Sequence, residues 1–249
     1  MEKVFYTGTA ISSLLYFVAG VRLLRLGMRT GETPEYLLGT VFLLWSLFYY
    51  LDILPYVLVD QSLLTPLFFV GRAVIVVATI ITALFTQWVF RNKEVWARWL
   101  IASVVLCLIV GLGGSIAIGD WGGVRPLFNP WYWVEALGTV APFVWMAAES
   151  LRQYGKAKRR LRLNLCDPLV CNRYLLLGLA SVIWVVVEFV ATAHVIELEL
   201  TQGVSAPMDL LLMTTEFGAI AVVWLVFFPS TCYRRWIQGA APVALSGEG

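Results

Sequence analysis

The chain has 249 residues, of which 60% are hydrophobic and 14% are charged, and its formal net charge is +2. This composition lies outside the range of soluble globular domains, so it excludes that class and predicts an all-α integral membrane protein. We expect membrane lipids around it and no nucleic-acid partner.

Apolar segments long enough to cross a bilayer recur along nearly the whole sequence. Crossing about 30 Å of hydrocarbon takes about 20 helical residues. We expect seven transmembrane helices, at residues 5–26, 35–59, 63–90, 97–118, 131–152, 174–196 and 206–229. Residues 1–236 are therefore expected to form one seven-helix transmembrane domain, and residues 237–249 a short disordered cytoplasmic tail.

Local signals support these boundaries. A capping residue followed by proline marks a helix start, because proline at the first helical position costs no hydrogen bond. Such pairs are Thr33-Pro34, Asn129-Pro130 and Asp167-Pro168. Gly111, Gly113 and Gly114 fall in the fourth segment and predict the close approach of a neighbouring helix.

Lysine and arginine follow the first, third, fifth and seventh segments and are scarce at the other ends. Because positive residues favour the cytoplasmic side, we expect the N-terminus outside and the C-terminus in the cytoplasm. The very short loops favour a prokaryotic, multi-pass protein of the cytoplasmic (inner) membrane. The basic loop 152–173 is an expected contact for anionic lipids or a cytoplasmic or membrane protein partner, unless it acts only as a topology signal.

An internal repeat is suggested by the second and sixth segments. Each has a glycine six residues before a tryptophan and an acidic residue beyond it. The matching residues are Gly39, Trp45 and Asp52 in one segment and Gly178, Trp184 and Glu188 in the other. The pattern predicts a 3+1+3 parallel repeat about an axis normal to the membrane. Chance similarity between apolar segments is the open alternative.

The expected spans contain Asp52, Arg72, Glu135, Glu188 and Glu216, each in the half nearest the outer side. A charge at mid-bilayer costs about 2.5 to 3.5 kcal/mol on insertion scales, so such residues are functional by default. Glu135 is close to the boundary and is expected to face water. Three acids and one arginine remain, and this imbalance predicts a bound proton, cation or ligand.

Aromatic residues share helix faces with two of these acids. Trp45, Tyr49 and Asp52 follow helical spacing, as do Trp184 and Glu188. These stripes predict the wall of a polar pocket that opens to the extracytoplasmic side. The expected ligand-binding residues are Asp52, Arg72, Glu188, Glu216, Trp45, Tyr49 and Trp184. Purely structural interhelical pairing of the charges is the alternative.

Seven helices with an outer N-terminus resemble the architecture of opsins and G-protein-coupled receptors, but the motifs of those families are absent. A retinal protein needs a Schiff-base lysine in its last helix, whereas Lys3, Lys93, Lys156 and Lys158 all lie outside the expected bilayer core. We therefore expect no retinal and no other cofactor. A single histidine, His194, predicts no metal site, and no nucleophile and base pair indicates catalysis.

These patterns favour a non-enzymatic protein that binds or senses a small polar or cationic solute and acts through a partner. One alternative is a proton- or cation-coupled transporter of a small solute. Another is a structural subunit of a membrane complex, in which the buried charges only hold helices together.

Overall fold

The computed structural model describes residues 2–58, 64–120, 125–201 and 206–239. These residues form eight helices and no strand, which confirms the all-α prediction. The helices are α1 (Glu2–Thr30), α2 (Thr33–Leu58), α3 (Leu64–Arg91), α4 (Val95–Ala117), α5 (Pro130–Leu161), α6 (Pro168–Thr201), α7 (Ala206–Phe227) and α8 (Thr231–Gly239).

Five of these helices, α1, α3, α4, α6 and α7, are long and apolar enough to cross a membrane by length and composition. The chain therefore has the character of a multi-pass helical membrane protein. Helices α2 and α5 have 26 and 32 residues and are long enough as well. Helix α5 is less apolar because it contains Glu135 and Glu149 and ends in a basic turn.

Several helix ends differ from those expected. Helix α5 continues to Leu161 and α6 begins at Pro168, so most of residues 152–173 are helical. The prediction of a basic loop over this whole range is therefore wrong. Lysine, arginine, alanine and leucine are strong helix formers and outweigh Gly155 in this stretch. The short helix α8 was not expected from the sequence, and residues 240–249 of the expected tail lie outside the described residues.

Two of the expected caps are formed. The Asn129 side chain accepts hydrogen bonds from the backbone nitrogens of Trp131 at 3.0 Å and Tyr132 at 3.3 Å at the start of α5. The Asp167 carboxylate accepts one from the Leu169 nitrogen at 2.8 Å at the start of α6. Both side chains satisfy donors that the first turn of a helix leaves unpaired.

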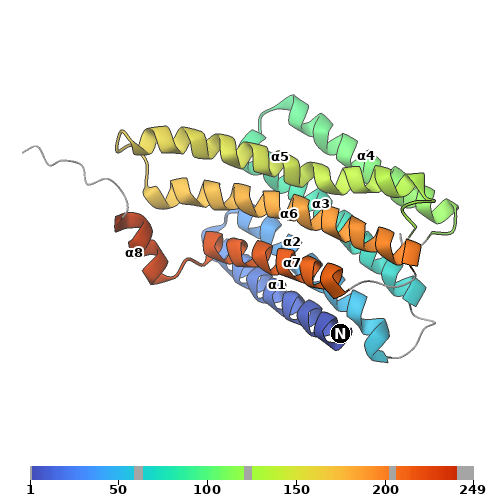
Figure 1. Cartoon of the computed structure of the whole chain (residues 1–249). Coiled ribbons are helices and arrows are strands. Elements are labelled where there is room, and N and C mark those ends of the chain that lie inside the picture. Colours follow the sequence, from blue (N-terminus) through green and yellow to red (C-terminus); the bar gives the residue numbers. More distant parts are fainter. Residues whose placement is uncertain (1, 59–63, 121–124, 202–205, 240–249) are drawn as a thin grey trace, which may run out of the picture.

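Six of the long helices form a closed ring, and α4 lies outside it (Figure 1). Around the ring, neighbours pack in the order α1, α2, α3, α5, α6, α7 and back to α1. Among the helices that the structure describes, α4 packs only on α3 and α5. The basic end of the bundle, where α1 ends and α8 begins, lies opposite the N-terminal end, where α1 starts (Figure 1).

An aromatic layer fills the centre of the ring. It consists of Tyr16, Trp45, Tyr49, Phe143 and Trp184, all buried and all near the middle of their helices. The ring centroids of Trp45 and Trp184 are 4.7 Å apart, and those of Tyr16 and Tyr49 are 5.6 Å apart with parallel planes. Such contacts add about 0.5 to 1.5 kcal/mol per pair beyond burial.

The glycines of α4 allow α5 to approach closely. A Cβ atom on Gly111 would lie 2.6 Å from the backbone nitrogen of Glu135, and one on Gly114 would overlap the Trp131 ring. The predicted close approach is therefore confirmed at these two positions. Gly113 points away from α5, because nothing lies within 4 Å of its Cβ position.

Candidate functional site

Arg72 of α3 forms an ion pair with Glu135 of α5, at the N-terminal end of the bundle. Its Nε also donates to Glu135 Oε1 at 3.3 Å, so the contact is bidentate. The side chains of Arg72 and Glu135 are only 11% and 13% exposed. The expectation that Glu135 simply faces water is therefore wrong, because α3 and α5 pack directly on each other.

The guanidinium of Arg72 is also fixed by the segment that links α4 to α5. Its Nη1 donates to the Asp120 carbonyl at 3.0 Å, and its Nη2 lies 3.3 Å from Ser115 Oγ. The amide of Asn129 donates to Ser115 Oγ at 2.9 Å and to Asp120 Oδ2 at 2.7 Å. Arg72 thus belongs to a hydrogen-bonded network that secures α3, α4 and α5, which is a structural role.

A second buried ion pair joins the same two helices near the basic end. Arg91 of α3 contacts Glu149 of α5 through Nε and Nη2, both at 2.8 Å. The Arg91 guanidinium lies 5.5 Å from the centroid of Trp96. Sequence analysis missed Glu149, although its position inside an apolar segment was the signal that could have identified it.

Two other acids lie beside the aromatic layer rather than beside Arg72. Glu216 of α7 is buried, and its carboxyl is close enough to the hydroxyls of Tyr16 and Tyr49 to interact with both. Glu188 of α6 is partly buried and within electrostatic range of Tyr49 and Tyr132. Glu188 lies on the side of the layer that faces the N-terminal end of the bundle, because it follows Trp184 by one turn of α6.

Glu188 makes no hydrogen bond or ion pair with any residue that the structure describes. The Tyr16 hydroxyl is fully buried and also has no hydrogen-bond partner among those residues. Burying such groups without a partner costs free energy, so each normally binds water or a ligand. The Glu188 carboxyl and the Tyr16 hydroxyl beside the layer therefore lack a hydrogen-bond partner among the described residues.

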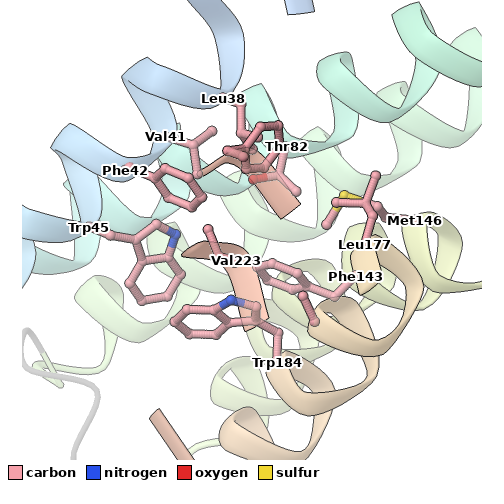
Figure 2. A pocket seen from close by; sticks show the side chains of 12 residues that line it. Leu38, Val41, Phe42, Trp45, Thr82, Phe143, Met146, Leu177, Trp184 and Val223 are labelled. Atoms are coloured by element: carbon pink, nitrogen blue, oxygen red, sulfur yellow. The ribbon is translucent and has the colours of Figure 1, made fainter. Parts of the chain in front are cut away.

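A small cavity adjoins the aromatic layer on the side of the basic end, because its wall includes Leu38 near the start of α2 and Phe227 at the end of α7. Figure 2 shows the side chains that line it. Its volume is about 30 Å³, which is enough to admit water. Apolar side chains dominate the wall, and no ionisable residue lines it. The rings of Trp45, Phe143 and Trp184 form part of its wall (Figure 2).

The structure brings together part of the predicted binding set. Trp45, Tyr49 and Trp184 meet in the layer, with Glu188 and Glu216 beside it. Arg72 is held in the separate network described above. Asp52 belongs to α2, but its side chain lies outside the part of the chain that the structure describes.

No protein-family model, no curated protein and no solved structure matches this chain. Among the described residues, no group of three or more histidine, cysteine, aspartate or glutamate side chains is placed to hold a metal ion. The candidate site therefore consists of two carboxyls, two tyrosine hydroxyls and two indoles near the middle of the helical ring.

Proposed function

We propose that this protein crosses the inner membrane seven times and binds a small cationic solute beside the aromatic layer, without catalysing a reaction. Helices α2 and α5 complete the seven spans, since their 26 and 32 residues correspond to about 39 and 48 Å of helix. The N-terminus lies outside, because the basic residues gather at the other end of the bundle.

The observation that carries the proposal is the placement of Glu188. Arg72, the arginine at the same end of the bundle, is engaged by Glu135 and by the Asp120 carbonyl. Glu188 is left without a hydrogen bond or ion pair to a described residue, within electrostatic range of Tyr49 and Tyr132. A carboxylate at this depth needs a counter-charge, and a bound cation supplies one.

The aromatic surroundings favour an organic cation over a bare metal ion. Ring faces of tryptophan and tyrosine attract ammonium groups, by about 2 kcal/mol or more when the contact is desolvated. The oxygen of the Tyr16 hydroxyl, which has no hydrogen-bond partner among the described residues, adds a partial negative charge within electrostatic range of Glu216. Occupancy would alter the packing of α6 and α7, and a partner protein at the basic end would sense this change.

The test is a thermal-shift titration of the detergent-purified protein with tetramethylammonium, against sodium chloride at equal ionic strength. We expect a rise in Tm that saturates with tetramethylammonium and is absent with sodium chloride. Glu188→Gln should abolish the rise, whereas Glu32→Gln, at an exposed position near the start of α2, should preserve it. An equal Tm rise in the wild type and Glu188→Gln would contradict the proposed site.

A further inference from the structure

The ring has two halves, α1–α3 and α5–α7, and glycines at matching positions in these halves make equivalent contacts. A Cβ atom on Gly39 of α2 would lie 3.0 Å from Leu24 Cγ of α1. A Cβ atom on Gly178 of α6 would lie 2.9 Å from Leu151 Cγ of α5. The sequence match of Gly39 with Gly178 thus extends to the helix that each glycine packs against.

This alignment carries through the first and fifth helices. When Leu24 is matched to Leu151, five of the eight buried positions described in α1 coincide with buried positions of α5. The matching pairs are Ser12 and Thr139, Tyr16 and Phe143, Ala19 and Met146, Gly20 and Ala147, and Leu23 and Ser150. Agreement over three helical turns indicates the same orientation of both helices in the ring.

The third and seventh helices fit the same alignment. Gly8, which matches Glu135, packs on Met213 of α7, just as Glu135 contacts Arg72 of α3. Matching Arg72 with Met213 again aligns buried positions along both helices. These pairs are Gly71 and Leu212, Ala78 and Ala219, Thr79 and Ile220, Thr82 and Val223, and Phe85 and Val226.

The axis that relates the halves passes between Trp45 and Trp184. These two residues are equivalent in the alignment, and their rings are in contact at 4.7 Å. Equivalent residues touch each other only at a two-fold axis. The candidate site lies beside this axis and breaks the symmetry, since Glu188 is equivalent to Tyr49 and Glu216 to Ile75. The match of Glu188 with Asp52 that the sequence pattern suggested is therefore wrong in this register.

The two boundaries between the halves differ in strength. The α3–α5 boundary holds two ion pairs, Arg72 with Glu135 and Arg91 with Glu149. Among the described residues, the α1–α7 boundary shows no ion pair: the flexible thioether of Met213 lies against Gly8, the guanidinium of Arg22 lies over Trp224 and Phe228, and Glu216 is within electrostatic range of Tyr16. The first boundary therefore suits a hinge, and the second suits a surface that opens.

We propose that the halves swing about the α3–α5 boundary, part Trp45 from Trp184, and thereby carry the cationic solute across the membrane. The proposal rests on the binding site of the preceding section and adds transport to it. In the arrangement described, the indoles of Trp45 and Trp184 line the cavity and separate it from Glu188. Parallel repeats with a site at their interface are a common basis of alternating access.

The test locks the opening boundary with a disulfide. In a background where Cys107, Cys166, Cys171 and Cys232 are replaced by serine or alanine, Gly8→Cys and Met213→Cys are introduced together. A Cβ atom on Gly8 would lie 3.6 Å from Met213 Cγ, within reach of a disulfide. The control pair, Ser13→Cys with Ser46→Cys, joins α1 to α2 inside one half, where the hydroxyl oxygens are 3.3 Å apart.

Uptake of radiolabelled tetramethylammonium into liposomes is measured before and after oxidation, together with the thermal shift. We expect oxidation to reduce uptake by the Gly8–Met213 pair to that of empty liposomes, with full recovery on reduction and an intact thermal shift. The Ser13–Ser46 pair should transport equally in both states. Undiminished uptake by the locked protein would overturn the swinging motion.

The two proposals fail separately. If the wild type shows a thermal shift that depends on Glu188 but no uptake, transport is refuted and the binding function stands. If neither a thermal shift nor uptake is seen, the proposed function fails together with the transport that rests on it.

Discussion

Removing Arg72 should destabilise the protein strongly, and removing Glu135 as well should restore much of the loss. In Arg72→Met, the carboxylate of Glu135 stays 13% exposed with no guanidinium beside it. The Asp120 carbonyl and Ser115 also lose a donor. Removing one partner of a buried ion pair lowers the free energy of unfolding by about 3 to 5 kcal/mol, because a buried charge is left uncompensated.

The double variant Arg72→Met with Glu135→Gln removes both charges. The equivalent place in the other half holds Met213 against Gly8, so an uncharged contact is compatible with this packing. We expect the double variant to be more stable than Arg72→Met by about 2 kcal/mol, which is within the usual range of coupling energies for contacting residues.

The measurement is the free energy of unfolding in mixed micelles for the wild type, both single variants and the double variant. Glu94→Gln serves as the control, since Glu94 is half exposed and 4.0 Å from Arg91; it should change stability by less than about 0.5 kcal/mol. Strictly additive losses would refute the structural pairing. Rescue of Arg72→Met by Glu188→Gln instead would show that the arginine serves the binding site.

Three further predictions follow from single contacts. Arg91→Met should cost about 3 to 5 kcal/mol and be partly rescued by Glu149→Gln, measured in the same unfolding assay; no coupling would contradict the second ion pair. Gly111→Ala should lower Tm, because its Cβ would lie 2.6 Å from the Glu135 backbone. Gly113→Ala should leave stability unchanged or raise it by up to about 1 kcal/mol, since the space around this position is open. Equal effects of the two variants on Tm would contradict the α4–α5 packing. Tyr16→Phe removes a hydroxyl that has no partner among the described residues, so stability should hold while tetramethylammonium affinity falls; unchanged affinity would exclude Tyr16 from the site.

Much of the fold could be predicted because its signals are local. Apolar segments, the Asn129 and Asp167 caps and the glycines of α4 gave the seven long helices and two of their close approaches. Helix α8 was not predicted, because its nine residues are too few to form a long apolar segment. The prediction of a loop at residues 152–173 was wrong because it rested on their positive charge, although these residue types favour helix.

The candidate site was predicted only in part, for a different reason. Trp45, Tyr49, Trp184 and Glu188 share helix faces that periodicity can identify. The partner of Arg72 lies on another helix, and helices such as α2, α4 and α7 are apolar all round, so sequence does not indicate which face turns inward.

The sequence by itself therefore determined that this is a helical membrane protein, where its long helices run, and that several acids are buried. Only the tertiary structure decided that Glu135 and not Glu188 neutralises Arg72, and that Trp45 meets Trp184 at the centre. Hydropathy acts along one helix at a time, whereas charge pairing depends on the rotation and neighbours of each helix, which packing alone fixes.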